Sequence, residues 1–229
     1  MNPLKNYYEK YWSSFDGGID TDPTTPARIS NLKEALAAIP EGSKILDFGC
    51  GLGDFTDFIS TLGFDVLGVD ISETVINLAK IKHNNVKFHI LNEDDRIPAP
   101  ANHFSAVWSS EVIEHIFDVN AHLKEIHRVL KPNGVYILTT PFHGRLKNSL
   151  ITLLKFNKHF NPEGEHIRFF DKSGLKLCLE KAGFEPFLWK GIGRIPPLYR
   201  TLFVMAKKVS IPFWQTEKPT DVSNRSGGK

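Results

Sequence analysis

Residues 44–55 read Lys44-Ile45-Leu46-Asp47-Phe48-Gly49-Cys50-Gly51-Leu52-Gly53-Asp54-Phe55, an apolar run that leads directly into a turn with alternating glycines. The apolar part is typical of a buried strand in a parallel sheet. Glycines accept unusual backbone dihedral angles, and without a side chain they let the main chain approach a ligand closely. We therefore expect a ligand at the N-terminus of the helix that follows this turn.

A second apolar run, Val66 to Asp70, ends in a carboxylate about 20 residues after the glycines, where the acidic residue of a βαβ nucleotide site bonds the ribose hydroxyls. The glycines stand at positions 49, 51 and 53 with Asp47 just before them, whereas dinucleotide sites have the spacing G-x-G-x-x-G. The third glycine is therefore misplaced for a dehydrogenase. The arrangement resembles motif I of the class I methyltransferases that use S-adenosylmethionine (SAM).

The resemblance extends beyond this motif, over roughly residues 26–190. Three later stretches resemble, in order, the adenine-contacting loop, the fourth strand and the turn before the fifth strand of that family: residues 92–98, 104–115 and 130–134. With Glu111-Val112-Ile113-Glu114-His115 included, the chain most resembles the branch that contains the ubiquinone-biosynthesis O-methyltransferases.

The order of strand and helix patterns predicts an α/β fold built from right-handed βαβ units. The resemblance implies a Rossmann-like doubly wound sheet of seven strands, mostly parallel with a reversed last strand and with helices on both faces. Residues 184–189 and 199–207 are expected to form the reversed strand pair that closes such sheets.

The length of 229 residues predicts one large domain, residues 1–215, followed by a disordered polar tail at 216–229. Residues 1–40 are expected to form an N-terminal helical cap and residues 142–170 a substrate-side insertion. Cys50 and Cys178 are expected to be small buried residues rather than a disulfide pair, which favours a reducing cytoplasm as the location. We expect no signal peptide and no membrane span, and a net charge of +2 is too small to indicate nucleic-acid binding.

The resemblance also implies which residues hold SAM. They occupy the matching motif positions and are Arg28, Asp47, Gly49, Gly51, Gly53, Asp70, Ile71, Glu93, Asp94 and Ser110. Either Glu93 or Asp94 is expected to contact the adenine, and Arg28 to pair with the carboxylate of the cofactor. A solvated Arg28 on the surface is the alternative. Ser105 departs from the family, which usually carries Asp at this position.

His115 is a candidate general base for methyl transfer. It follows the fourth predicted strand closely enough to reach the transferred methyl group, and histidine suits the removal of a proton from an oxygen or nitrogen acceptor. A histidine that only holds the loop is the alternative.

A further hypothesis is a metal site. Glu111, Glu114 and His115 are spaced to share one side of a helical turn, and two carboxylates with an imidazole suit Mg or Mn. His166 would complete the set of ligands. Similar sequences carry a metal in the ubiquinone O-methyltransferases, while many relatives with the same residues use none.

Two flanking segments have open interpretations. Tyr8, Tyr11, Trp12 and Phe15 share one helical face, which would either pack on the domain or form a lid over the cofactor. Residues 146–160 combine an apolar face with basic residues, so their helix would either cover the acceptor pocket or lie on an anionic membrane surface.

These observations predict a SAM-dependent methyltransferase that transfers a methyl group to an oxygen, or a nitrogen, of a small-molecule or lipid-linked acceptor. The expected location is the cytoplasm, with or without peripheral membrane contact. Two alternatives stay open. One is a methyltransferase of sugars or glycan precursors, because the motifs describe the cofactor rather than the acceptor, and the other is a SAM-binding protein without catalysis.

Overall fold

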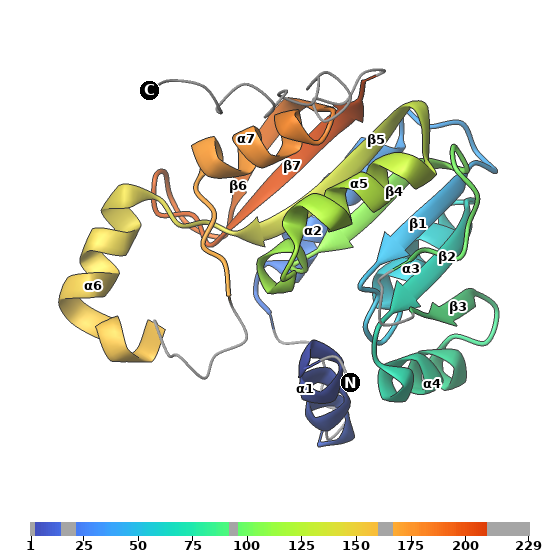
Figure 1. Ribbon diagram of the computed structural model, residues 1–229, viewed down its shortest axis with the longest axis horizontal. Coiled ribbons are helices and arrows are strands. Elements are labelled where there is room, and N and C mark those ends of the chain that lie inside the picture. Colours follow the sequence, from blue (N-terminus) through green and yellow to red (C-terminus); the bar gives the residue numbers. More distant parts are fainter. Residues whose placement is uncertain (1–2, 15–21, 92–95, 160–166, 210–229) are drawn as a thin grey trace, which may run out of the picture.

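The computed structural model of the chain describes residues 3–14, 22–91, 96–159 and 167–209 (Figure 1). Within these ranges one sheet is built from β1 (Lys44–Phe48), β2 (Asp65–Asp70), β3 (Lys87–Ile90), β4 (Phe104–Ser110), β5 (Leu130–Pro141), β6 (Phe184–Ile192) and β7 (Thr201–Lys208). The helices are α1 (Pro3–Ser13), α2 (Thr25–Leu36), α3 (Asp54–Thr61), α4 (Glu73–Lys82), the 3₁₀ helix η1 (Ile113–His115), α5 (Val119–Val129), α6 (Arg145–His159) and α7 (Lys172–Lys181).

The strands lie in the order β3-β2-β1-β4-β5-β7-β6. Strands β1 to β5 pair in parallel, and β7 is antiparallel to both β5 and β6. The predicted doubly wound sheet with a reversed last strand is therefore confirmed. Residues 184–189 and 199–207, expected to form the pair that closes the sheet, lie in β6 and β7, which are antiparallel to each other. Strand β6 runs in the direction of β1–β5, and β7, inserted between β5 and β6, is the reversed strand. The strand order changes direction between β1 and β4, and such a switch point opens a crevice at the carboxyl ends of the strands.

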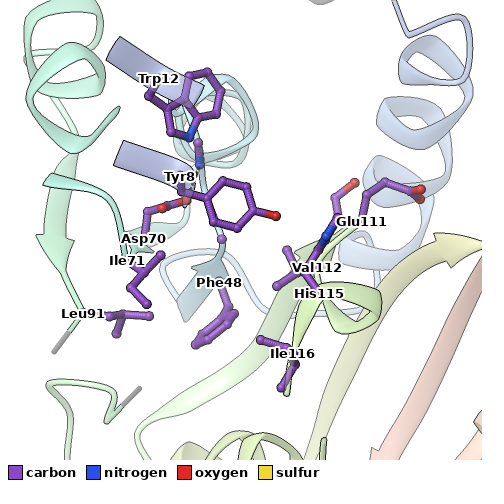
Figure 2. A pocket seen from close by; sticks show the side chains of 13 residues that line it. Tyr8, Trp12, Phe48, Asp70, Ile71, Leu91, Glu111, Val112, His115 and Ile116 are labelled. Atoms are coloured by element: carbon purple, nitrogen blue, oxygen red, sulfur yellow. Dashed lines mark hydrogen bonds between the residues drawn. The ribbon is translucent and has the colours of Figure 1, made fainter. Parts of the chain in front are cut away.

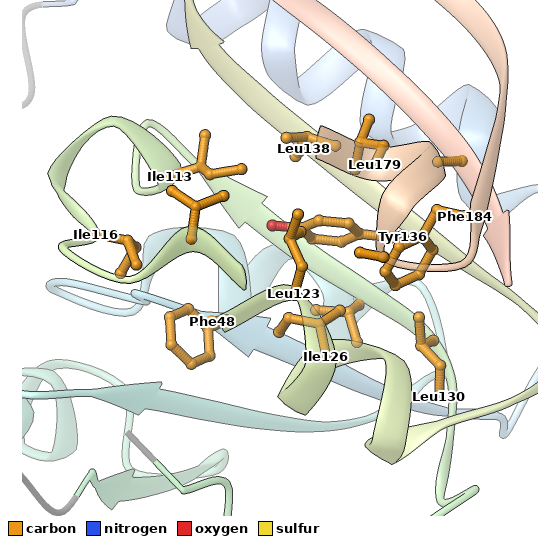
Figure 3. Close-up of a cluster of buried hydrophobic side chains, with 14 of the residues drawn as sticks. Phe48, Ile113, Ile116, Leu123, Ile126, Leu130, Tyr136, Leu138, Leu179 and Phe184 are labelled. Atoms are coloured by element: carbon orange, nitrogen blue, oxygen red, sulfur yellow. The ribbon is translucent and has the colours of Figure 1, made fainter. Parts of the chain in front are cut away.

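Helices cover both faces of the sheet, as predicted (Figure 1). On one face, Leu123 of α5 and Leu179 of α7 pack with Tyr136 of β5 in the larger apolar cluster (Figure 3). On the other face, Leu32 of α2 shares a second cluster with Trp108 of β4. Successive side chains of a strand point to opposite faces, so each central strand contributes to both clusters. The burial on both faces holds the carboxyl ends of β1, β2 and β4 in fixed positions.

Helix α4 extends this scaffold beside the crevice. Its Ile76 and Ala79 are fully buried and pack with Phe88 of β3. The helix begins at Ser72, whose hydroxyl accepts a hydrogen bond from the Val75 amide at 3.3 Å, as N-cap serines do. The cap fixes the short segment between the end of β2 and α4.

The start of β5 differs from the prediction of a turn at residues 130–134. Strand β5 already begins at Leu130, which pairs with Phe104, and the register then shifts so that Ala106 pairs with Val135. Asn133 adopts a φ angle of 63° within this irregularity. The expected turn is thus absorbed into the strand as a bulge, which leaves both ends of the segment in the ladder.

Helix α6 stands apart from the two layers of helices in Figure 1. Its Leu153 and Leu154 are 80% and 76% exposed. None of the described helices is long and apolar enough to cross a membrane. The predicted tail at 216–229 lies outside the described residues, and the division into cap, domain and insertion stays a prediction.

Candidate cofactor and active site

A cavity of about 220 Å³ lies at the carboxyl ends of β1, β2 and β4 (Figure 2). Its walls come from helix α1, the glycine turn, the end of β2, the end of β3 and the loop after β4. They comprise Tyr8, Trp12, Phe48, Gly49, Gly51, Asp70, Ile71, Leu91, Ser110, Glu111, Val112, His115 and Ile116. Figure 2 shows Trp12 and Tyr8 over the crevice, with Asp70 and Ile71 on one side and Glu111 and His115 on the other.

The glycine turn forms the floor of this cavity. The amides of Gly49 and Cys50 both donate to the Val69 carbonyl, at 2.8 and 3.0 Å, so the turn is fastened to β2. Gly51 has a φ angle of 51°, and a Cβ atom there would lie 3.6 Å from the Trp12 ring, on the cavity side. The absence of a side chain at Gly51 therefore keeps space open for a ligand.

Gly53 has a different role from the one predicted. It is the N-cap of α3 with a φ angle of 82°, and a Cβ atom there would lie 2.5 Å from the Phe88 ring. It is not among the residues that line the cavity. Its positive φ angle and the closeness of the Phe88 ring both favour glycine at this position.

Asp70 ends β2 beside the turn. Its carboxylate accepts hydrogen bonds from the Gly51 amide at 3.1 Å and from the Ser72 amide at 3.0 Å. Burial raises the pKa of Asp70 above its ordinary value, and the nearby charge of Glu9 contributes to the same shift, against the opposing effect of these hydrogen bonds. A partly exposed carboxylate with remaining acceptor capacity faces the cavity here.

Asp47 lies beneath the turn rather than in the cavity wall. It is 1% exposed, and its carboxylate accepts a hydrogen bond from the Thr56 hydroxyl at 2.7 Å. Burial, helped by the charge of Asp70, raises the pKa of Asp47 to about 7. Its observed contacts connect the end of β1 to α3, so it supports the turn from below.

Arg28 is 5% exposed, so the alternative of a solvated surface arginine is wrong. Its guanidinium donates to the Ser110 hydroxyl at 2.8 Å and forms an ion pair with Asp22 at 2.5 Å. The Ser110 hydroxyl in turn lies 3.0 Å from that of Thr139. Arg28 is thus fixed directly behind Ser110, which belongs to the cavity wall.

His115 belongs to the cavity wall, at the end of η1. It is 8% exposed, and its ring meets that of Tyr8 edge to face with 6.0 Å between the centroids. Its Nε2 atom lies 3.7 Å from Oε1 of Glu114. Glu114 is itself 1% exposed, and its other carboxylate oxygen accepts a hydrogen bond from Thr140 at 3.1 Å. The arrangement places an imidazole at the cavity with a buried carboxylate behind it.

The predicted metal set does not form among the described residues. Glu111 has a left-handed φ angle of 54°, and only residues 113–115 are helical, so Glu111 is not on the same helical turn as Glu114 and His115. Burial raises the pKa of Glu111 to about 6, although hydrogen bonding and the charge of Arg28 oppose this shift. No group of three or more His, Cys, Asp or Glu side chains in the described ranges is placed to hold a metal ion. The three members of the set that the structure describes therefore do not fit Mg or Mn. His166 lies outside these ranges.

Two further predicted residues, Glu93 and Asp94, also lie outside the described residues. Several apolar residues of the cavity wall were not predicted, namely Phe48, Leu91, Val112 and Ile116. In a sequence they cannot be distinguished from core residues, because both environments favour apolar side chains. Tyr8 and Trp12 were predicted only as one of two alternatives, and their position over the cavity favours the lid.

A sheet with this strand order, a glycine turn after β1 and a carboxylate that lines the cavity at the end of β2 define a protein of the SAM-dependent methyltransferase class. Comparison with known families agrees. The chain belongs to the methyltransferase domain family, whose model matches residues 24–187.

Two curated relatives share about a quarter to a third of their aligned residues with this chain. The chain is 26% identical over 176 residues to a ubiquinone biosynthesis O-methyltransferase of Hydrogenovibrio crunogenus. This alignment covers 73% of this chain and 71% of the relative. It is 30% identical over 152 residues to the mitochondrial ubiquinone biosynthesis O-methyltransferase of Homo sapiens, covering 62% of this chain but 41% of the human protein. The chain therefore spans about two-fifths of the human relative's length.

A solved structure shares the fold. The magnesium protoporphyrin IX methyltransferase of Synechocystis PCC 6803, determined with bound SAH, superposes with a TM-score of 0.69 at 16% identity. The match covers 90% of this chain and 98% of that one. This structure shows the shared fold, while the family match and the curated relatives show that the chain is a SAM-dependent methyltransferase.

Proposed function

We propose that this enzyme transfers the methyl group of SAM to a hydroxyl oxygen of a small-molecule or lipid-linked acceptor. The observation that carries this proposal is the position of His115, an imidazole in the wall of the cavity beside Tyr8. The names of the ubiquinone-pathway relatives support oxygen as the methylated atom. A nitrogen acceptor would need the same removal of a proton.

The cofactor is assigned to the glycine turn and the strand ends around it. Asp70 would accept hydrogen bonds from the ribose hydroxyls, while Gly51 and Ile71 would lie against the nucleoside. Ser110, held by Arg28, would face the amino-acid part, with the guanidinium supplying positive charge for the carboxylate. SAM, when bound, supplies an electrophilic methyl group. In this assignment Asp47 and Gly53 shape the turn without touching the ligand, and Glu93 or Asp94 remains the proposed adenine contact.

His115 is assigned the proton of the acceptor hydroxyl. As the new oxygen–carbon bond forms, the sulfur–methyl bond of SAM would break and S-adenosylhomocysteine would leave, while the acceptor oxygen gives its proton to His115. Histidine exchanges protons readily near neutral pH. The Glu114 carboxylate, 3.7 Å from Nε2, would stabilise the imidazolium that results. The apolar surroundings formed by Val112 and Ile116 would exclude water from the reacting atoms.

Helix α6 is assigned peripheral contact with an anionic membrane surface rather than a cover for the pocket. Among the described residues none of α6 lines the cavity, and Leu153 and Leu154 are the most exposed of its leucines. Arg145 is exposed at the start of the helix, and the sequence adds Lys155 and Lys158 near its end. Apolar side chains with a basic flank suit the interface of anionic lipids.

The deciding experiment is calorimetry with S-adenosylhomocysteine followed by a turnover screen with SAM against catechols, quinone precursors and sugars. Methylation of a catechol or quinone-precursor hydroxyl supports the proposal. Methylation of sugars alone would favour the glycan alternative. Tight binding without turnover on any acceptor would instead favour a SAM-binding protein without catalysis.

A further inference from the structure

The Glu9 carboxylate joins helix α1 to the start of α4. Oε1 of Glu9 accepts a hydrogen bond from the Glu73 amide at 2.6 Å. Oε2 of Glu9 accepts two more, from the Thr74 amide and the Ser72 hydroxyl, each at 3.2 Å. The first amides of a helix have no partner within the helix and carry the positive end of its dipole, so they are suited to a carboxylate. Glu9 thus caps α4 from outside.

The charge state of Glu9 fits this contact. Partial burial alone would raise the pKa of Glu9, but the hydrogen bonds from Thr74, Glu73 and Ser72 outweigh it and lower the pKa below its ordinary value of 4.5. Glu9 is therefore ionised at neutral pH. Each of these bonds is charge-assisted, which makes them stronger than bonds between neutral groups.

Two aromatic residues of the same helix, one directly before Glu9 and one three positions after it, face the cofactor cavity. Tyr8 and Trp12 both belong to its wall, and the Trp12 ring lies over Gly51. Tyr7 and Tyr11 are 41% and 45% exposed, so much of the aromatic surface of α1 is not buried. Helix α4 is the element that α1 contacts most extensively. The polar contact of Glu9 therefore attaches α1 to the element beside the cavity.

Ser72 connects this contact to the proposed ribose ligand. Its hydroxyl donates to Glu9, and its amide donates to Asp70 at 3.0 Å. Asp70 in turn accepts a hydrogen bond from Gly51 in the floor of the cavity. One short segment thus holds the carboxylate at the floor and the helix that covers it.

We infer that Glu9 is a positioning residue, whose carboxylate fastens α1 to the N-terminus of α4 so that Tyr8 and Trp12 close over the bound cofactor. The inference rests on the assignment of this cavity to SAM. Closing of the site would slow the release of cofactor and product, and opening would require the Glu9 contact to break. Glu9 itself touches neither the ligand nor the reacting atoms in this scheme.

The test compares Glu9→Gln with Glu73→Gln. Glutamine at position 9 offers one acceptor oxygen and no charge to three donors, whereas Glu73→Gln removes an equal charge from the same helix end and leaves the Glu9 carboxylate in place. The side chain of Glu73 is exposed. Glu9→Asp, which keeps the charge on a shorter side chain, provides the conservative variant.

The first readout is hydrogen exchange of the amides of residues 3–14 in the protein without ligand. We expect faster exchange in Glu9→Gln, unchanged exchange in Glu73→Gln and an intermediate rate in Glu9→Asp. The second readout is the dissociation rate of S-adenosylhomocysteine, which should rise about 10-fold or more in Glu9→Gln because hydrogen bonds to a charged group are lost. The association rate should change little.

Unchanged exchange of residues 3–14 in Glu9→Gln would overturn the inference, as would equal dissociation rates in the two glutamine variants. A lowered melting temperature with an unchanged dissociation rate would make Glu9 a purely structural residue and would also overturn it. Should the unaltered protein fail to bind S-adenosylhomocysteine, the assignment of the cavity to SAM fails, and the exchange experiment still decides whether Glu9 holds α1.

Discussion

The Asp70 carboxylate accepts a hydrogen bond from the Gly51 amide at 3.1 Å, so the last residue of β2 and the glycine turn after β1 form one continuous surface. The two residues are 19 positions apart in the sequence. Parallel pairing of β1 with β2 brings them together, because it aligns the carboxyl ends of both strands. The surface combines a carboxylate with main chain that carries no side chain, which suits a nucleoside.

Replacing the carboxylate should weaken cofactor binding. We expect Asp70→Ala to reduce the affinity for S-adenosylhomocysteine by about 1–3 kcal/mol, since hydrogen bonds to a charged group are lost. Calorimetry measures the change. The control is Asp65→Ala at the other end of β2, where the carboxylate pairs with Lys44 and Lys87 away from the cavity. Equal affinities of Asp70→Ala and the unaltered protein would remove Asp70 from the site.

The assignment of His115 predicts a loss of turnover without a loss of binding. His115→Ala should lower kcat by about 10²–10⁴, the usual contribution of a positioned acid or base. Affinity for S-adenosylhomocysteine should stay close to that of the unaltered protein. The matched control is His89→Ala on β3, whose side chain is exposed. A normal kcat in His115→Ala would leave this histidine with the structural role that the sequence had also allowed.

The buried Asp47 predicts a pH dependence of stability. Its pKa is about 7 in the folded protein against an ordinary value of 3.8, so between these values the folded state keeps a proton that the unfolded state has released. Stability therefore falls as pH rises through this window and levels off above it. Asp47→Asn removes the titration, so its free energy of unfolding should increase relative to the unaltered protein between about pH 4 and pH 7.

Urea unfolding across this pH range measures the difference. The control is Asp57→Asn in α3, a partly exposed carboxylate at a nearby helical position. A difference between Asp47→Asn and the unaltered protein that does not vary with pH would show that Asp47 does not titrate in this window.

The geometry of Glu111 predicts activity that does not depend on a divalent ion. Because Glu111 does not share a helical turn with Glu114 and His115, we expect turnover to persist in EDTA. The measurement is kcat after dialysis against the chelator, with and without added Mg or Mn. Activity that is lost in EDTA and restored by either ion would return the metal hypothesis, with His166 as the next residue to replace.

Exposure of the α6 leucines predicts salt-sensitive lipid binding. We expect the protein to sediment with anionic but not with neutral vesicles at low salt, and less so as salt is raised, because the attraction is electrostatic. Leu153→Glu should reduce the bound fraction. Leu177→Glu serves as the control, since Leu177 of α7 is also exposed but lies on a different element. Equal recovery in the supernatant with both vesicle types would leave α6 as a cover for the acceptor pocket.

Local sequence was sufficient for the parts of the site that come from consecutive residues. The stretch 44–55 specified a strand, a turn and a helix, because apolar runs and glycines act on their immediate neighbours. The distance to Asp70 followed from the length of one βαβ unit, and the position of His115 from that of β4. These elements, and the sheet they imply, agree with the structure.

Tertiary structure decided what depends on contacts between distant residues. Arg28 could equally have been solvated, and only its packing against Asp22 and Ser110 made it buried. The spacing of Glu111, Glu114 and His115 had favoured a shared set of metal ligands, but the left-handed φ angle of Glu111 keeps it off the helical turn of the other two. Residue spacing predicts a shared helical face only if the backbone is helical. The sequence did not specify whether the backbone at Glu111 is helical.

The sequence by itself determined the class of fold and the cofactor turn, because both arise from short-range preferences repeated along the chain. Only the tertiary structure decided that β7 lies between β5 and β6, that α1 covers the cavity and that Glu9 caps α4. Glu9 and Glu73 are 64 residues apart, and their contact is formed only after the intervening strands and helices have packed. A sequence pattern cannot predict such a contact, because the free energy of the contact depends on the burial and geometry of the whole domain.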